Sequence, residues 1–388
     1  DFGYDVSDYC GVDPTFGTLD DFDRLVREAH LRNIKVIIDF VPNHTSDQHP
    51  WFIKSCSSLD NIKRDWYIWK DPKPDGGPPN NWRSVFGGSA WAFDARTRQY
   101  YLHSFLKEQP DLNWFNPMVK EAMKNVLRFW FNRGADGIRV DAVEFLAKDE
   151  LFRNDPPNPD FKEGKSDPYS AVLHAFSKNQ PKLFGILNEL TAVMSEYPDR
   201  FMVTEVYPEE REKAAEYVKF YRNCDNTKTS PFNFEAFSLP WQANAYKKFI
   251  DKFQSALQPE DLPIYVLGNH DCSRLASRIG REQSRVAAMM LLSLPGMPFV
   301  YYGEEIGMED VVIPEDKIQD PIEKNVPGIG VGRDPARTPM QWSDEKFAGF
   351  SNREPWLPIS SLYTAYNVKA QSVNPASLLF LYRTLIHY

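Results

Sequence analysis

Four short segments of the sequence combine an apolar, β-branched stretch with side chains that could carry out acid–base or nucleophilic chemistry. They are DFVPNH at 39–44, GIRVDAVEF at 137–145, VTEVYP at 203–208 and VLGNHD at 266–271. Side chains two residues apart on a strand point to the same face, so Arg139 and Asp141 are expected to lie side by side.

Three of these segments place a carboxylate at or just after the end of the apolar stretch: Asp141, Glu205 and Asp271. Any one of them alone could cap a helix, but burying several charges in one pocket is costly unless they are paired, so the set favours a functional site. Carboxylates about 5–5.5 Å apart serve retaining glycosidases, one as nucleophile and one as acid and base. We expect Arg139 to keep Asp141 ionised, and the more apolar strand before Glu205 to raise that residue's pKa.

The histidines of the same segments, His44 and His270, raise the alternative of a metal-dependent hydrolase. No HExxH or HxH spacing accompanies them, so a zinc site of the usual kind is disfavoured and no metal ligands are predicted. The four cysteines are widely spaced and form no CxxC pair, which indicates free thiols rather than a metal or disulfide framework.

The elements that must position these residues alternate between strand and helix patterns. Apolar residues recur at helical spacing in 17–33, 116–134, 210–221 and 282–296, each near a short apolar strand pattern. This alternation predicts a parallel sheet with crossover helices, either doubly wound or closed as a (β/α)8 barrel. We favour the barrel, an α/β fold, because polar residues follow the ends of at least four strands and no GxGxxG phosphate loop follows a strand.

The segment 44–111 interrupts the alternation and is rich in Trp, Tyr, Pro, Gly and Asn. A segment of this length and composition predicts a small inserted domain above the active-site face of the barrel. We therefore assign residues 1–43 and 112–388 to the barrel and 44–111 to the insertion. The chain opens in a loop pattern without an initiator Met and ends within a helical pattern, so we expect it to be truncated at both ends.

The overall composition narrows the function class. The chain has 388 residues, 42% of them hydrophobic, and a net charge of −9 without a basic stripe, which disfavours nucleic acid as a partner. No apolar run reaches the ~18 residues of a membrane span, and the first residues lack the basic and apolar regions of a signal peptide. No membrane anchor is visible, and the compartment is left unassigned.

The four segments resemble, in order and spacing, the four conserved regions of the α-amylase family, glycoside hydrolase family 13. The resemblance covers nearly the whole chain and implies a (β/α)8 barrel with an inserted domain B after the third strand. The barrel's first two strands and a C-terminal β-domain are expected to lie outside this chain. The resemblance further implies that Asp141 is the nucleophile, Glu205 the general acid/base and Asp271 the transition-state stabiliser. The residues expected to line the −1 subsite, which holds the terminal glucose, are Arg139, His44 and His270, with Asp39 in a supporting position.

Three further motifs resemble the oligo-1,6-glucosidase group of this family, which includes α-glucosidases and sucrose isomerases. These motifs are QPDLN at 109–113, DFGYDVSDY at 1–9 and GRDPARTPMQW at 332–342. The resemblance implies that Asp1 and Tyr4 grip the terminal glucose and that Arg333, rather than Arg337, reaches the same glucose. Such a clamp implies a pocket that removes one glucose at a time.

The residues after the nucleophile bear on the substrate. Ala142 matches members of the group that cleave α-1,4 rather than α-1,6 bonds. Glu144 matches no residue with a known role in the family, and we expect its side chain to face solvent or to contact a loop. The implied function is a maltase-like retaining exo-α-glucosidase acting on terminal α-1,4-linked glucose of maltose, short malto-oligosaccharides or sucrose. No cofactor is required, and a structural calcium would belong to a loop before Asp1. The alternatives are a sucrose isomerase or transglucosidase, an oligo-1,6-glucosidase, and a non-enzymatic heavy chain of an amino-acid transporter.

Overall fold

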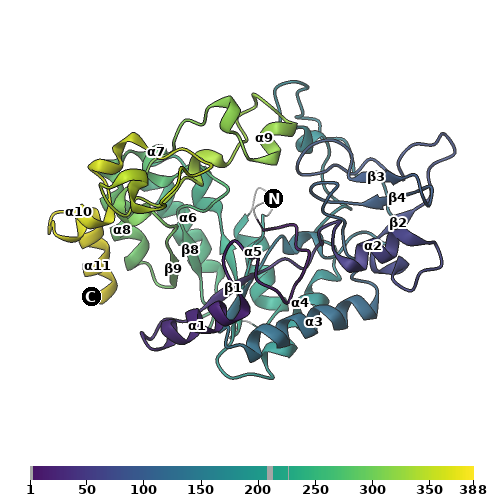
Figure 1. Cartoon of the computed structure of the whole chain (residues 1–388), viewed down its shortest axis with the longest axis horizontal. Coiled ribbons are helices and arrows are strands. Elements are labelled where there is room, and N and C mark those ends of the chain that lie inside the picture. Colours follow the sequence, from purple (N-terminus) through teal and green to yellow (C-terminus); the bar gives the residue numbers. More distant parts are fainter. Residues whose placement is uncertain (1–2, 208–212, 226) are drawn as a thin grey trace. The chain divides into compact units, whose positions relative to one another are not determined.

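The computed structural model describes residues 3–207, 213–225 and 227–388 (Figure 1). The chain divides into two compact units. Asp1–Pro208 and Lys219–Pro231 make up the first unit, and Glu209–Val218 and Phe232–Tyr388 make up the second. No described helix is long and apolar enough to span a membrane.

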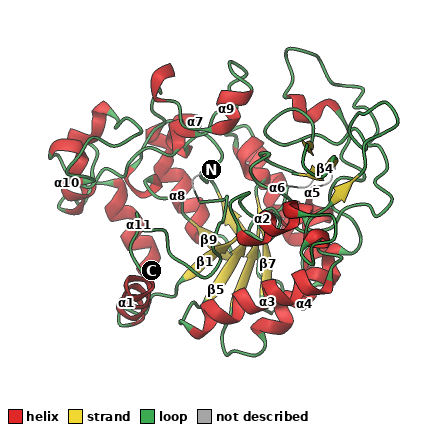
Figure 2. Ribbon diagram, turned by 45° about the vertical axis from the view of Figure 1, so that its right-hand side comes forward, coloured by secondary structure: helices red, strands yellow, loops and turns green. Residues whose placement is uncertain are grey.

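Parallel strands build the main sheet, in the order β1-β5-β6-β7-β8-β9 (Figure 2). The first unit holds β1 (Ile37–Phe40), β5 (Gly137–Val140), β6 (Phe201–Thr204) and the start of β7 (Thr229–Asn233). The second unit holds the end of β7, β8 (Ile264–Val266) and β9 (Met297–Phe299). Ile138, Val140 and Ile264 are fully buried, as expected of strands covered on both faces. This parallel order confirms the predicted fold class of a (β/α)8 barrel.

Helices alternate with the strands, as the sequence pattern predicts. The longer helices are α1 (Leu19–His30), α3 (Pro117–Asn132), α4 (Leu183–Met194), α5 (Lys213–Asn223), α6 (Ala243–Ala256), α8 (Ser284–Ser293) and α11 (Leu378–His387). The shorter ones are α2 (Pro50–Ser57), α7 (Leu275–Ile279), α9 (Pro321–Asn325) and α10 (Val368–Ser372). α1 begins with the predicted capping box, in which the side chains of Thr18 and Asp21 each accept the other's backbone N–H. α3 begins at Asn116, whose side chain accepts the N–H of Met118.

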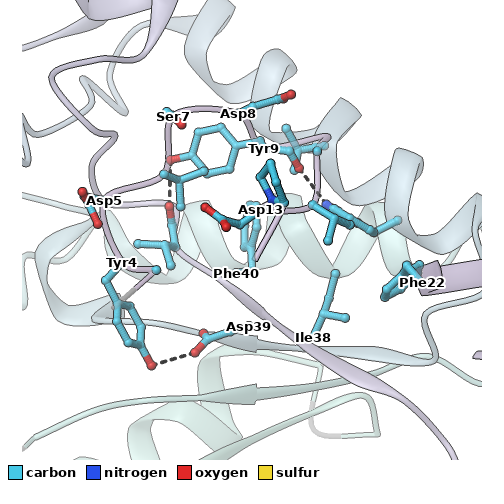
Figure 3. Close-up of a pocket in the computed structure, with 18 residues that line it drawn as sticks. Tyr4, Asp5, Ser7, Asp8, Tyr9, Asp13, Phe22, Ile38, Asp39 and Phe40 are labelled. Atoms are coloured by element: carbon cyan, nitrogen blue, oxygen red, sulfur yellow. Dashed lines mark hydrogen bonds between the residues drawn. The ribbon is translucent and has the colours of Figure 1, made fainter. Parts of the chain in front are cut away.

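The loop before α1 lies against β1 and α3, as Figure 3 shows for Tyr4 to Asp13. The hydroxyl of Tyr9 lies 2.8 Å from the carbonyl oxygen of Val41 and 2.6 Å from that of His44. The indole of Trp130 in α3 donates to the carbonyl of Tyr9 at 2.8 Å. These bonds fix a loop that has no regular structure of its own, and so fix the position of Tyr4.

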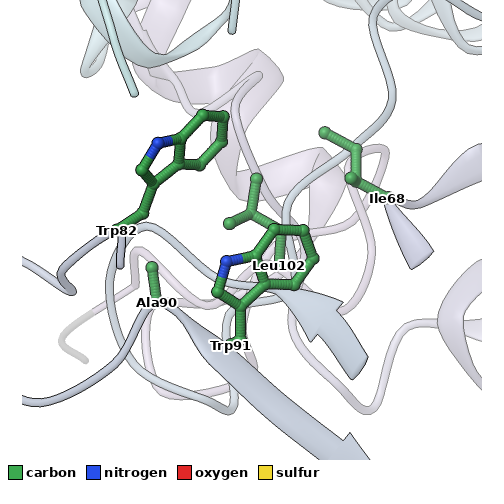
Figure 4. Close-up of a cluster of buried hydrophobic side chains, with 5 residues drawn as sticks. All are labelled: Ile68, Trp82, Ala90, Trp91 and Leu102. Carbon is green, nitrogen blue, oxygen red and sulfur yellow. The ribbon is translucent and has the colours of Figure 1, made fainter. Parts of the chain in front are cut away.

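The segment 44–111 contains its own antiparallel sheet, in the order β2-β4-β3, formed by β2 (Trp69–Lys70), β3 (Trp91–Asp94) and β4 (Gln99–Leu102). Its buried core consists of Ile68, Trp82, Ala90, Trp91 and Leu102 (Figure 4). The two indole rings stack with their centroids 6.3 Å apart. An isolated bridge pairs His44 with Asp111, so the segment leaves and returns at one place.

Candidate active site

Arg139 is the centre of the polar cluster in the first unit. Parallel pairing places Asp39 of β1 beside Arg139 of β5, and Glu205 directly follows the next strand, β6. One guanidinium nitrogen, Nη1, lies 2.7 Å from Asp39 Oδ2 and 2.8 Å from Asp141 Oδ1, while Nη2 lies 2.8 Å from Glu205 Oε1. The expected contact between Arg139 and Asp141 is therefore present, and the same cation binds two further carboxylates from neighbouring strands.

The buried acids Asp141 and Glu205 share one environment. The Glu205 Oε2 atom also accepts the backbone N–H of Ala142 at 3.0 Å, and Ala142 adopts the left-handed conformation with φ of 47°. Burial raises the pKa of Asp141 well above its usual range, the nearby charge of Glu205 raises it further, and Arg139 only partly offsets both. Burial and the charge of Glu205 therefore outweigh Arg139, and the pKa of Asp141 is raised rather than lowered, contrary to the expectation that Arg139 keeps this residue ionised.

Tyr4 and His44 position one another in the same unit. The Tyr4 hydroxyl donates to Asp39 Oδ2 at 2.8 Å. The backbone carbonyl of Tyr4 accepts from His44 Nε2 at 2.9 Å. Burial lowers the pKa of His44 to about 4, so the ring is neutral and uses its one N–H to hold the Tyr4 backbone. Asp1, the other residue expected in this loop, lies outside the described residues.

A cavity of about 700 Å³ lies between this loop, β1 and α3 in the first unit (Figure 3). Its lining includes Tyr4 and Asp39 at one side and the apolar side chains of Ile38, Val126 and Trp130 elsewhere. Tyr4 and Asp39, which both contact Arg139, therefore lie at the edge of this cavity.

Lys148 and Asp111 form a buried ion pair that the sequence patterns did not single out. Lys148 Nζ lies 2.7 Å from Asp111 Oδ2, and both side chains are almost completely buried. Asn43 joins them: its amide nitrogen donates to Asp111 at 3.1 Å, and its oxygen accepts from Lys148 at 2.9 Å. Burial favours protonation of Asp111, but the charge and hydrogen bonds of Lys148 keep its pKa below the usual value. The QPDLN motif pointed to this region only through Asp111, because nothing in the sequence pairs it with Lys148.

Glu144 contacts two loops rather than solvent. Its Oε1 atom pairs with Lys178 Nζ at 2.9 Å, and its Oε2 atom accepts the backbone N–H of Tyr207 at 2.9 Å. The side chain is buried, so the solvent-facing alternative is wrong. Glu144 ties the segment after β6, which carries Glu205, to the loop around Lys178.

In the second unit, Asp271 is bound by two arginines. Arg333 Nη1 and Arg337 Nη2 lie 3.1 Å and 2.8 Å from the same oxygen, Asp271 Oδ1, and His270 Nε2 lies 3.3 Å from Oδ2. Both arginines thus reach Asp271, and the choice of Arg333 rather than Arg337 as the residue that reaches the terminal glucose stays a prediction.

Asp320, a residue that the motifs did not indicate, orients Arg333. Its carboxylate accepts from Arg333 Nε at 2.9 Å and from Nη2 at 2.7 Å. Burial of Asp320 raises its pKa, but the paired Arg333 more than offsets this and lowers it below the usual value. The bidentate contact leaves Nη1 of Arg333 directed at Asp271.

The predicted site residues thus gather within their own units: Tyr4, His44, Arg139, Asp141 and Glu205 in the first, and His270, Asp271 and Arg333 in the second. Within residues 3–207, 213–225 and 227–388, no three His, Cys, Asp or Glu side chains are grouped as ligands for a metal ion.

Known proteins resemble the chain over its whole length. The model of the α-amylase catalytic domain matches residues 1–388. A probable α-glucosidase of Rhizobium meliloti is 40% identical, covering 100% of this chain and 72% of the relative, and an α-glucosidase of Apis mellifera is 39% identical, covering 99% and 68%. The solved structure of an α-glucosyl transfer enzyme, XgtA, superposes with a TM-score of 0.91 at 37% identity, covering 99% of this chain and 73% of that protein.

Proposed function

The chain belongs to the α-amylase family, and on that basis we propose that it is a retaining exo-α-glucosidase acting on maltose, short malto-oligosaccharides or sucrose. The observation that carries the proposal is the contact of Arg139 with Asp141 and Glu205, two buried acids at the ends of adjacent strands. A retaining glycosidase needs one ionised and one protonated carboxyl group at the same sugar. We assign the ionised form to Asp141 and the protonated form to Glu205.

In the proposed reaction, Asp141 attacks the anomeric carbon while Glu205 gives its proton to the departing glycosidic oxygen. The carbon–oxygen bond to the leaving group breaks, and a covalent glucosyl–Asp141 ester forms. Glu205 then takes a proton from water, whose oxygen displaces Asp141 and releases glucose with its original configuration. Arg139 stabilises the single negative charge of the pair at each stage, because it contacts both carboxyl groups.

The remaining predicted residues would hold the terminal glucose. Asp271 contacts two arginines and carries oxygens that can accept hydrogen bonds from sugar hydroxyls, and we assign it the role of transition-state stabiliser. Tyr4 offers an aromatic face, and His44 and His270 complete the proposed −1 subsite. Ala142, small and next to the nucleophile, favours α-1,4 linkages.

The decisive experiment replaces the proposed nucleophile. Asp141→Asn should reduce the hydrolysis of an aryl α-glucoside by at least about a thousandfold. Asp39→Asn is the matched control, because it also removes a carboxylate charge from Arg139 without removing the nucleophile, and its loss should be much smaller. Azide should restore turnover to Asp141→Gly and give β-glucosyl azide. An Asp141→Asn enzyme that keeps its activity would refute the assignment.

Glucosyl transfer is the second candidate, because the solved relative with a TM-score of 0.91 is an α-glucosyl transfer enzyme. Products formed from sucrose separate the two: a hydrolase releases glucose and fructose, whereas an isomerase gives a rearranged disaccharide. Comparing maltose with isomaltose tests the oligo-1,6-glucosidase alternative. A non-enzymatic transporter heavy chain is disfavoured because Asp141, Glu205 and Asp271 are all present.

A further inference from the structure

Glu304, in the second unit, is a buried acid that the proposed mechanism does not use. It begins the short helical turn Glu304–Ile306 after β9 and is 5% exposed. In the part of the chain that the structure describes, neither of its carboxylate oxygens makes a hydrogen bond. Because no polar partner orients this side chain, the atoms packed around it must hold it in place.

The carboxyl group of Glu304 lies against Gly268, in the loop that follows β8 and carries Asp271. A methyl group added at Gly268 would lie 2.3 Å from Glu304 Oε1 and 3.5 Å from the carboxyl carbon, whereas the next neighbour, Cβ of Tyr301, is 4.0 Å away. The φ angle of Gly268 is not positive, so its backbone conformation suits any residue. The close approach of Glu304 therefore excludes a side chain at this position.

Further bonds join the loops that follow β8 and β9. Arg274 Nη1 donates to the carbonyl of Tyr302 at 2.8 Å, and the backbone N–H of Arg274 donates to Asp310 Oδ1 at 2.8 Å. These bonds hold the loop after β9 in a fixed place beside the loop after β8. The position of the backbone at Gly268 therefore depends on the side chain of Glu304 that lies against it.

We propose that Glu304 is a positioning residue for Asp271, because its side chain packs against Gly268 and so fixes the turn Leu267–Asp271. The inference rests on the proposed function, in which Asp271 is the transition-state stabiliser. Gly268 and Glu304 form a matched pair, in which one residue lacks a side chain where the other fills the space. A change in either residue should displace the Asp271 carboxylate from the sugar, and a compensating change in the other should return it.

The surroundings of Glu304 favour its neutral form. The charged and titratable groups close to it are Arg274, Arg278, Tyr301, Glu305, Cys272 and Tyr382. Burial, together with the charge of Glu305, raises the pKa of Glu304 to about 8, against the opposing effects of the two arginines and the nearby backbone of Tyr301. Glutamine has nearly the shape of a protonated glutamate and never ionises, so Glu304→Gln should keep the contact with Gly268 at every pH.

The test is a double-mutant cycle on the hydrolysis of an aryl α-glucoside. Gly268→Ala and Glu304→Ala should each lower kcat roughly tenfold or more, with a smaller change in KM, because Asp271 acts in the transition state. The double variant should recover most of the lost activity, because the added methyl group takes the space of the removed carboxyl group. Glu304→Gln should keep most of the activity at neutral pH.

A pH profile separates positioning from general damage to the fold. The substrate is α-glucosyl fluoride, whose leaving group needs no proton from Glu205. The alkaline limb of kcat/KM should begin near the Glu304 pKa of about 8 in the unaltered protein and move to higher pH in Glu304→Gln. An unmoved limb would overturn the proposal.

The matched control is Glu305→Ala, which removes the neighbouring acid. The carboxylate of Glu305 accepts the backbone N–H of Gly303 at 2.7 Å and lies no closer than 4.0 Å to a methyl group added at Gly268. Glu305→Ala should therefore give no recovery when it is combined with Gly268→Ala. Recovery in this control, or additive losses in Gly268→Ala/Glu304→Ala, would overturn the proposal.

Failure of the proposed function has a different signature. An unaltered protein that hydrolyses no α-glucoside would refute the glucosidase assignment, and the double-mutant cycle would then be read from Tm. Additive changes in Tm would show that Gly268 and Glu304 are not in contact and would overturn the inference on its own.

Discussion

Replacing Lys148 by Met should destabilise the first unit strongly, because it leaves the Asp111 carboxylate buried without its counter-ion. The two side chains are 1% and 0% exposed and lie 2.7 Å apart. Asn43 and Ser104 still donate hydrogen bonds to Asp111, but none of them carries a charge. Breaking one partner of a buried pair costs about 3–5 kcal/mol, which corresponds to a fall in Tm of roughly 4–6 °C for a chain of 388 residues.

The matched control is Lys182→Met, because Lys182 also pairs with a carboxylate, that of Glu150, but both side chains are more than half exposed. An exposed pair contributes about 0–1 kcal/mol, so the Tm of this variant should change little. Thermal unfolding followed by circular dichroism measures both variants. A Lys148→Met protein that melts within about 2 °C of the Lys182→Met control would refute the assignment of Lys148 as the charge partner of Asp111.

The pH dependence gives an independent check on the same pair. Lys148 keeps the pKa of Asp111 below its usual value in the folded protein. The stability that follows from a lowered folded-state pKa is present above the unfolded-state pKa of about 4 and is lost as the pH falls through the folded-state pKa. The difference in Tm between the unaltered protein and Lys148→Met should therefore shrink as the pH falls below about 4. A difference that stays constant would contradict the electrostatic explanation.

Four further predictions concern the candidate site. Glu205→Gln removes the neighbouring charge that raises the pKa of Asp141. The acidic limb of the plot of hydrolysis rate against pH, measured with an activated aryl glucoside, should therefore move to lower pH. An unmoved limb would show that the two acids are not coupled. Ala142→Gly should raise Tm, because glycine accepts a φ of 47° at roughly 1 kcal/mol less strain. Ala142→Val should lower the ratio of kcat/KM for maltose to kcat/KM for isomaltose. An unchanged ratio would show that Ala142 does not set the linkage preference. Burial lowers the pKa of His44 to about 4, so NMR of its ring nitrogens should show a neutral ring from pH 8 to pH 5. Titration near 6.5 would contradict the effect of burial on this ring.

The sequence alone determined the features that depend on local spacing. The alternation of apolar strand and helix patterns predicted a parallel sheet, and Thr18 with Asp21 predicted the start of α1. The spacing of Arg139 and Asp141 predicted their contact, because neighbours on one strand face share a direction whatever the rest of the fold does.

Only the tertiary structure decided which distant groups meet. Strand pairing brought Glu205 to Arg139, and the fold joined Lys148 to Asp111, which lies earlier in the chain. The loop containing Arg333 and Arg337 delivered both arginines to Asp271. Burial and the charge of Glu205 then raise the pKa of Asp141, although its neighbour Arg139 acts to lower it. These outcomes depend on strand register, on how deeply each group is buried and on the sum of the surrounding charges. None of these can be read from the order of residues along the chain.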